Sequence, residues 1–241
     1  YTAMERLKEA KNGVYLSPLR ILALENYEKL NNNKIICNLL TGEEEILKEG
    51  ATHTSCTIEK VDLKKEYDIA IIDEIQMIND PQRGAAWTRT LLGLRCKEIH
   101  ICGALNAKEI IEKILNDCKD EYEFKEYKRS IPLKVQDRNF SYDNVDEGDA
   151  IVVFSKKKVL QIAQQYSEKG IKASIIYGDL PPEVRRKQYD MFIKKENKVL
   201  VTTDAIGMGV NLPIKRIIFV DIQKFDGEEI RSLTSQEVKQ V

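Results

Sequence analysis

Short apolar runs alternate with longer amphipathic segments along most of the chain. The apolar runs predict strands at 13–17, 34–39, 68–73, 98–103, 150–155, 173–178, 198–203 and 216–221. Amphipathic segments predict helices between many of them, at 18–31, 82–93, 106–118, 156–169 and 182–195. Strands that are apolar along their whole length and joined by helices are typical of parallel sheets covered on both faces. The pattern therefore predicts an α/β fold.

The alternation stops at about residues 129–149. This stretch, RSIPLKVQDRNFSYDNVDEGDA, is polar, becomes acidic near its end and has no long helical pattern. Polar segments without helical periodicity are typical of the linkers that join domains. We therefore predict a boundary close to 144–148, which divides the chain into two α/β domains, 1–145 and 146–241.

Composition limits the partners and the cellular compartment that we expect for these domains. Lys and Arg together number 38 against 39 Asp and Glu, so no global positive field indicates a nucleic-acid partner, although a local basic groove stays compatible with this balance. The five cysteines are scattered and include no Cys-x-x-Cys pair, which favours reduced thiols in a cytosolic type of compartment. No apolar run approaches the roughly 20 residues of a membrane span, and no secretory signal is visible. We expect no membrane role.

Two adjacent acids end the strand within YDIAIIDEIQMIND (67–80). Ligands of open α/β sheets bind at the carboxyl ends of strands, where Asp73 and Glu74 are placed. One carboxylate there can hold Mg²⁺ and a second can orient or deprotonate an attacking water, as phosphoryl transfer requires. The alternative is a plain helix N-terminus, where acids are favoured by the helix dipole. The acids alone leave both interpretations open.

The second domain carries a comparable strand end, VLVTTDAIGMGVNLP (199–213). Its glycines, Gly207 and Gly209, allow the backbone to approach a phosphate or another domain closely. A tight turn with no ligand would use the same residues.

The order of these segments along the whole chain is more specific than any one of them. The chain resembles superfamily 2 helicases of the DExH/D-box type through SPLR (17–20), CTIE (56–59), DEIQ (73–76), ICGAL (101–105), IVVFSKKK (151–158), IYGDLPPEVRRKQ (176–188) and TTDAIGMGVNLP (202–213). The DEIQ variant and the last two segments narrow the resemblance to the ATP-dependent RNA helicases of the mitochondrial degradosome and their bacterial relatives.

This resemblance implies two tandem RecA-like domains, each a mostly parallel sheet covered by helices, with ATP between them. It implies that Asp73 holds Mg²⁺, that Glu74 orients or activates the water, and that Gln76 couples the ATP site to the other domain. In the second domain it implies that Gly209 and Asn211 face the nucleotide. It also implies a set of residues along the backbone of the nucleic acid: Ser17, Pro18, Arg20, Thr57, Ser155 and Thr203. Contacts to phosphates carry no sequence information, so binding should be salt-sensitive and largely independent of sequence.

Several of these residues have simpler structural interpretations. Ser17 and Pro18 are suited to cap the predicted helix at 18–31. Lys156, Lys157 and Lys158 are compatible with a solvated first turn of a helix. We expect Trp87 to be a packing residue. His53 and His100 have no partners visible in the sequence, so they receive no role.

Two parts of the family pattern are missing from these 241 residues. No Gly-x-x-x-x-Gly-Lys-Ser/Thr loop occurs, and no Gln-x-x-Gly-Arg-x-Gly-Arg motif follows SQEVKQV. We therefore expect a piece of a longer protein, truncated at both ends, whose parent is an ATP-driven helicase and which by itself is not an active ATPase. Gly103 and Ala104 also replace the usual Ser-Ala-Thr.

Other functions stay open at this point. One is a non-catalytic nucleic-acid-binding scaffold that retains the fold, and another is a superfamily 2 translocase on DNA, since no residue visibly reads the 2′-hydroxyl. The resemblance implies single-stranded or partly duplex RNA as the partner, together with an exoribonuclease. The compartment expected by default is a bacterial cytoplasm. The resemblance also allows the mitochondrial matrix, although no targeting segment is seen.

Overall fold

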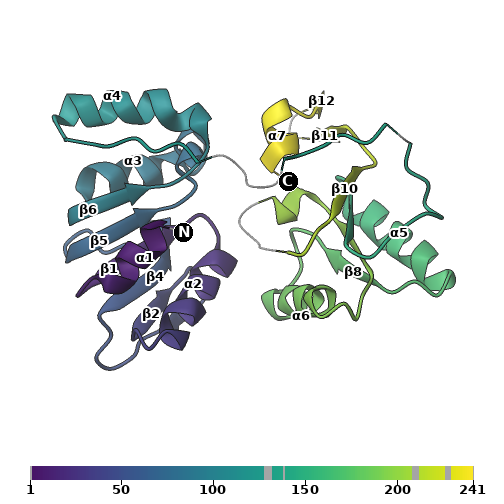
Figure 1. The fold of residues 1–241 in the computed structure, drawn as a ribbon, viewed down its shortest axis with the longest axis horizontal. Helices are drawn as coiled ribbons and strands as arrows, with labels where there is room; N and C mark the ends of the chain where they lie inside the picture. The colour runs from purple at the N-terminus through teal and green to yellow at the C-terminus, as the bar shows by residue number, and fades with distance from the viewer. Residues whose placement is uncertain (1, 128–131, 138, 208–211, 226–228, 241) are drawn as a thin grey trace. The chain divides into compact units, whose positions relative to one another are not determined.

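The computed structural model describes residues 2–127, 132–137, 139–207, 212–225 and 229–240. The chain forms two compact units, residues 1–128 and 129–241, and each unit contains a sheet with its own buried core (Figure 1). None of the helices in the described ranges combines the length and apolarity that crossing a bilayer would require.

The first unit is built on a six-stranded sheet with the order β3-β2-β4-β1-β5-β6. All neighbouring pairs are parallel except β2 and β3, which form an antiparallel edge. The bounds of its strands are β1 (Gly13–Ser17), β2 (Cys37–Leu40), β3 (Glu45–Ile46), β4 (His53–Thr57), β5 (Glu66–Ile72) and β6 (Arg95–Ile101).

Helices cover both faces of this sheet. Leu7 of α1 (Thr2–Glu9) and Leu30 of α2 (Arg20–Asn32) pack on one face with Tyr15 of β1. Trp87 of α3 (Gly84–Gly93) and Ile111 of α4 (Lys108–Cys118) pack on the other face with the strand residues on either side of Tyr15, Val14 and Leu16. Successive side chains of a strand point to opposite faces, which explains why a fully buried, apolar strand serves two cores. Three short 3₁₀ helices complete the unit: η1 (Ile58–Lys60), η2 (Ile75–Asn79) and η3 (Leu105–Ala107).

The second unit is built on a four-stranded parallel sheet with the order β10-β7-β9-β8. Its strands are β7 (Asp149–Val152), β8 (Ala173–Ile176), β9 (Val199–Thr202) and β10 (Arg216–Phe219). On β8, Ile175 packs in the core formed with α5 (Lys156–Glu168). The Oγ of Ser174 next to it donates to the carbonyl of Gln188 in α6 (Pro182–Ile193) at 2.8 Å, so the two helices cover opposite faces.

Short elements complete the second unit. The 3₁₀ helix η4 (Asp204–Ile206) follows β9. The strands β11 (Gln223–Phe225) and β12 (Ile230–Ser232) pair antiparallel and precede α7 (Ser235–Gln240).

The predicted α/β fold is confirmed, and each predicted strand and helix is found to within a few residues. The sequence analysis did not predict β4, because its residues His-Thr-Ser-Cys-Thr are mostly polar although all five are buried. The division between the units lies N-terminal of the boundary predicted near 144–148. The reason is that Phe140 and Val145 pack against the core of the second unit.

Candidate functional site

Three neighbouring strands of the first unit end at one edge of its sheet. Ser17 of β1 is paired with Thr57 of β4, and Leu16 is paired with Ile72 of β5, which places Asp73 beside Ser17. The backbone N–H of Asp73 continues the ladder by donating to the carbonyl of Leu16 at 2.9 Å. The parallel register therefore gathers the residues predicted for magnesium and for nucleic acid at adjacent strand ends, as expected for a ligand site in this class of sheet.

The Asp73 carboxylate is held by hydrogen bonds from two directions. The Tyr15 hydroxyl donates to Oδ2 at 2.5 Å, and the backbone N–H of Glu74 donates to Oδ1 at 3.0 Å. The Asp73 carbonyl accepts from Nε1 of Trp87 at 3.1 Å, and Trp87 is fully buried, so the packing role expected of it is confirmed. The side chain and the backbone of Asp73 are thus both fixed by neighbouring elements.

Glu74 has a left-handed backbone conformation, with φ 52° and ψ 48°. Such a conformation is costly for a residue with a Cβ and is concentrated at functional sites. The side chain of Glu74 is half-buried, and Nε2 of Gln76 donates to its Oε2. Burial raises the pKa of the Glu74 carboxyl above its ordinary value, the neighbouring charge of Asp73 raises it further, and the Gln76 hydrogen bond lowers it in part.

Gln76 connects these acids to the loop after β6. While its Nε2 donates to Glu74, its Oε1 accepts from the backbone N–H of Ala104 at 3.0 Å. This contact explains Gly103, because a Cβ there would lie 2.4 Å from the Gln76 Oε1 and 2.8 Å from the backbone nitrogen of Ile75. A serine at position 103, as in the usual Ser-Ala-Thr, would displace the Gln76 side chain.

The chemistry of this edge fits a magnesium ion that arrives with a phosphate ligand. Within the described ranges, no three His, Cys, Asp or Glu side chains form a metal site by themselves. Mg²⁺ is commonly bound by one or two carboxylates and completed by waters and substrate phosphates. The two Asp73 oxygens each accept one described hydrogen bond, and a carboxylate has about four acceptor positions, so each oxygen retains capacity for the ion or its waters.

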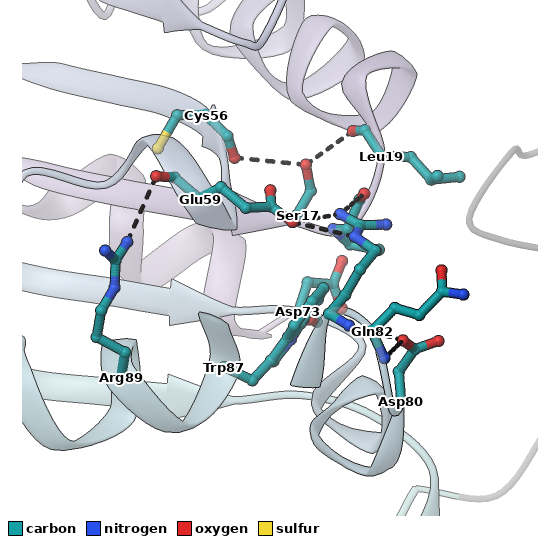
Figure 2. Close-up of polar contacts among 11 residues, drawn as sticks. Ser17, Leu19, Cys56, Glu59, Asp73, Asp80, Gln82, Trp87 and Arg89 are labelled. Atoms are coloured by element: carbon teal, nitrogen blue, oxygen red, sulfur yellow. Dashed lines mark hydrogen bonds and ion pairs between the residues drawn. The ribbon is translucent and has the colours of Figure 1, made fainter. Parts of the chain in front are cut away.

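The residues predicted for nucleic acid in this unit lie at the same edge. Ser17 is fully buried, and its Oγ donates to the Leu19 carbonyl at 2.9 Å and faces the Cys56 carbonyl at 3.4 Å (Figure 2). The expectation that Ser17 and Pro18 cap the following helix is wrong. The N-cap of α2 is Leu19, and the Ser17 hydroxyl donates a hydrogen bond rather than accepting one from the helix. Arg20 forms an ion pair with Glu43.

Arg83 joins this edge, and the sequence analysis did not identify it. Its Nε and Nη2 donate to Oε1 of Glu59 at 3.0 and 2.8 Å, and Nη2 also donates to the Pro18 carbonyl at 2.7 Å. The Arg83 guanidinium lies 5.4 Å from the ring centroid of Trp87. Arg83 thus fastens the loop after β1 and the turn after β4 to the start of α3.

A signal for Arg83 exists in the sequence, in the DPQRG segment that follows DEIQ. Asp80 accepts the backbone N–H groups of Gln82 and Arg83 at 2.9 and 2.8 Å, which is an Asx-type turn. Gly84 is required next, because a Cβ there would lie 2.2 Å from the Ile78 carbonyl oxygen. The acid, proline and glycine of DPQRG therefore predict a turn of fixed conformation, which holds the arginine in one position.

The candidate residues of the second unit also lie at strand ends. Ser155 is the N-cap of α5, where its Oγ accepts from the backbone N–H of Lys158 at 3.4 Å. Thr203 follows β9, and its Oγ1 accepts from the N–H of Ala205 at 3.3 Å. The predicted nucleotide contacts Gly209 and Asn211 lie outside the described residues.

The basic turn that follows Ser155 has partners of its own. Nζ of Lys158 lies 2.8 and 2.9 Å from the two carboxylate oxygens of Asp221, and Nζ of Lys156 lies 5.0 Å from the ring centroid of Tyr177. Lys157 is exposed. All three lysines are exposed, as the solvated first turn predicts, and Lys156 and Lys158 have these partners in addition.

The fold and the acids at the strand end define a class of protein, the helicases built from RecA-like domains. The chain belongs to the family described as the DEXQ-box helicase domain of Suv3, whose model matches residues 1–127. A second model, the helicase conserved C-terminal domain, matches residues 138–237.

Full-length relatives agree with this assignment. The chain is 42% identical over its whole length to the mitochondrial DExH-box ATP-dependent RNA helicase DExH18 of Arabidopsis thaliana, covering 32% of that protein. It is 43% identical over 93% of its length to the mitochondrial ATP-dependent RNA helicase SUPV3L1 of Homo sapiens, covering 29% of that protein. The chain thus spans about a third of the length of these relatives.

Solved structures confirm the RecA-like fold. A structure of Saccharomyces cerevisiae Dbp5 bound to RNA and ADP BeF3 matches 90% of this chain and 64% of its own, with a TM-score of 0.61. The two sequences are 17% identical, so this likeness concerns the fold alone.

Proposed function

We propose that the natural protein containing this chain is an ATP-dependent RNA helicase, which uses ATP hydrolysis to translocate on or unwind nucleic acid. The observation that carries the proposal is the fixed Asp73-Glu74-Gln76 constellation at the carboxyl end of β5, in a chain of the DEXQ-box family. The names of the relatives support RNA as the substrate, because they are described as ATP-dependent RNA helicases.

Each residue of the constellation has a proposed task. Asp73 would hold the magnesium ion, which supplies charge neutralisation at the phosphates of the nucleotide. Glu74 would orient the attacking water and accept its proton at a carboxylate oxygen. The raised pKa of Glu74 favours proton acceptance, since a base works best when its pKa approaches the working pH. Gln76 would set the position of Glu74 and report it to the loop after β6 through Ala104.

The nucleic-acid residues of the proposal are those at the neighbouring strand ends. Their hydroxyl and guanidinium groups suit phosphate oxygens, and they are Ser17, Pro18, Arg20, Thr57, Ser155 and Thr203. Several of these groups already have partners within the chain, including Arg20 with Glu43, so binding would exchange those contacts for phosphates. Gly209 and Asn211 stay predicted nucleotide contacts.

The test is RNA-stimulated ATP hydrolysis by the longest natural form of the protein that contains these residues. We expect RNA to stimulate hydrolysis, and Glu74→Gln to reduce the rate by about 10²-fold or more while RNA binding persists, because only the group that handles the water is changed. The matched control is Glu49→Gln, a change of the same chemistry at an exposed position of the same unit.

The outcomes separate the proposal from its alternatives. RNA binding without any ATP hydrolysis would support the non-catalytic scaffold instead. Equal stimulation by DNA and RNA of the same sequence would support a translocase without preference for RNA. An effect of Glu49→Gln as large as that of Glu74→Gln would contradict the role assigned to Glu74.

The cellular compartment and the protein partner are properties of the natural protein that contains this chain. The relatives' names carry the word mitochondrial, which supports the mitochondrial matrix over a bacterial cytoplasm for this protein. The bacterial cytoplasm stays a prediction of the sequence, as does the exoribonuclease partner implied by the family resemblance.

A further inference from the structure

Tyr15 occupies an unusual position for a core tyrosine. It lies in the middle of β1, is 4% exposed, and packs with Leu7, Leu30, Cys37 and Ile71 on the face covered by α1 and α2. A phenylalanine would fill the same space. Its hydroxyl, however, points along the sheet to the next strand end and donates to the Asp73 Oδ2 at 2.5 Å.

The Tyr15 hydroxyl is a dependable donor at this site. A phenol carries its proton at neutral pH, so the hydroxyl donates to the Asp73 carboxylate. Because the ring is held in the core, the position of the hydroxyl is fixed by packing, and so is the carboxylate that accepts from it.

We propose that Tyr15 is a positioning residue for the magnesium ligand, an inference that rests on the proposed function. Its hydroxyl occupies one acceptor position of Oδ2 while the Glu74 N–H occupies one of Oδ1, which sets the rotation of the carboxylate about its Cβ–Cγ bond. Donors that hold a metal-ligating carboxylate in one orientation contribute about 10- to 100-fold to metal affinity or activity. Tyr15 acts on the ion only through Asp73.

The chain offers a matched control for this proposal. Tyr67 lies at the start of β5, is 3% exposed, and belongs to the core on the opposite face of the same sheet. Its hydroxyl donates to the Asp62 carbonyl at 3.3 Å, well away from the strand end that carries Asp73. Tyr67→Phe therefore removes a buried hydroxyl with a hydrogen bond, as Tyr15→Phe does, without touching the acids.

The experiment measures how the binding of a fluorescent ADP depends on Mg²⁺ concentration, in the longest natural form of the protein. We expect Tyr15→Phe to raise the half-saturating Mg²⁺ concentration about 10-fold or more, and Tyr67→Phe to leave it within about twofold of the wild type. ATP hydrolysis by Tyr15→Phe should recover towards the wild-type rate at saturating Mg²⁺. Thermal unfolding without nucleotide measures any purely structural cost, which should be similar for the two variants.

Testing Tyr15→Phe in a variant that lacks the Asp73 carboxylate shows whether Tyr15 acts through Asp73. In Asp73→Asn the carboxylate is absent, so adding Tyr15→Phe should change the Mg²⁺ dependence no further. Unchanged Mg²⁺ dependence in Tyr15→Phe, or a shift of the same size in Tyr67→Phe, would overturn the inference and leave the helicase proposal standing. If nucleotide binding by the wild type did not depend on Mg²⁺ concentration, the proposed metal site would be wrong, and so would this inference.

Discussion

At the residue scale, one residue of the site combines a strained backbone with a partly buried charge. Glu74 is left-handed, half-buried and next to Asp73, and each of these features costs free energy in the folded state. Residues that violate local rules in this way are found where function requires them. We therefore expect that some substitutions of Glu74 stabilise the folded protein while they abolish ATP hydrolysis.

A glycine substitution at position 74 tests whether the left-handed backbone costs stability. Glu74→Gly should raise the free energy of unfolding of the first unit by about 1 kcal/mol relative to Glu74→Ala, because only glycine relieves the left-handed backbone. Chemical denaturation measures the difference, and both variants should lack ATP hydrolysis. Equal stabilities of the two variants would show that the backbone at this position stores no strain.

At the scale of elements, the end of the second unit is fixed by a capping box on α7. The Thr234 Oγ1 accepts from the Glu237 N–H at 3.2 Å, and a Glu237 oxygen accepts from the Thr234 N–H at 2.8 Å. Arg231 of β12 and Lys224 of β11 also pair with the Glu237 carboxylate, at 2.8 and 2.6 Å. One side chain thus joins the helix to both strands that precede it.

The capping box predicts a pH dependence. Hydrogen bonds from Arg231, and then those from Lys224 and Thr234, hold the pKa of Glu237 well below its ordinary value of 4.5. The stabilisation is therefore complete above pH 4.5 and is lost as the pH falls towards the lowered pKa. Glu237→Gln should lower the free energy of unfolding of the second unit by about 1 kcal/mol at pH 7, and by less at pH 3.

Denaturant unfolding at the two pH values measures this difference. The control is Glu196→Gln, which changes an exposed glutamate of the same unit. A deficit of Glu237→Gln that stays constant between pH 7 and pH 3 would contradict the role of the charged carboxylate.

Elements also show what the sequence could and could not predict. Apolar strands and amphipathic helices were predicted because burial alone determines them. The polar strand β4 was not, because its stabilising partners are distant along the chain: Ser55 Oγ donates to the Ala23 carbonyl at 2.6 Å, and His53 Nε2 lies 2.9 Å from the Leu7 carbonyl oxygen. The partners of Arg83 could not be predicted for the same reason, since Glu59 and Pro18 reach it only through the fold, whereas the turn that presents it has a local sequence signal.

At the scale of the whole molecule, two separate cores imply two separately stabilised units. Trp87 is fully buried in the first unit, and Leu200 is fully buried in the second. A large-to-small change in one core should leave the other core intact, because each of these cores is built from residues of a single unit.

Hydrogen exchange read along the chain tests this independence. Trp87→Ala should lower the free energy of unfolding of the first unit by about 3–5 kcal/mol and speed exchange in β1, β4 and β5, while β7 and β9 stay protected. Leu200→Ala should have the reverse pattern, with a loss of about 2–5 kcal/mol in the second unit. Faster exchange throughout the chain in either variant would show that the units unfold as one.

The register of β1 has a consequence for how this sequence can change in length. Tyr15 reaches Asp73 and Ser17 pairs with Thr57 within the same five-residue strand. A single inserted codon inside β1 would turn one of these residues to the wrong face, because side chains alternate along a strand. The contact of Tyr15 with Asp73, or the pairing of Ser17 with Thr57, would then be lost. An insertion in the exposed turn at Gly42 lies between β2 and β3 and leaves the register of β1 unchanged. Length variation among descendants of this gene should therefore be concentrated in its turns and absent from β1.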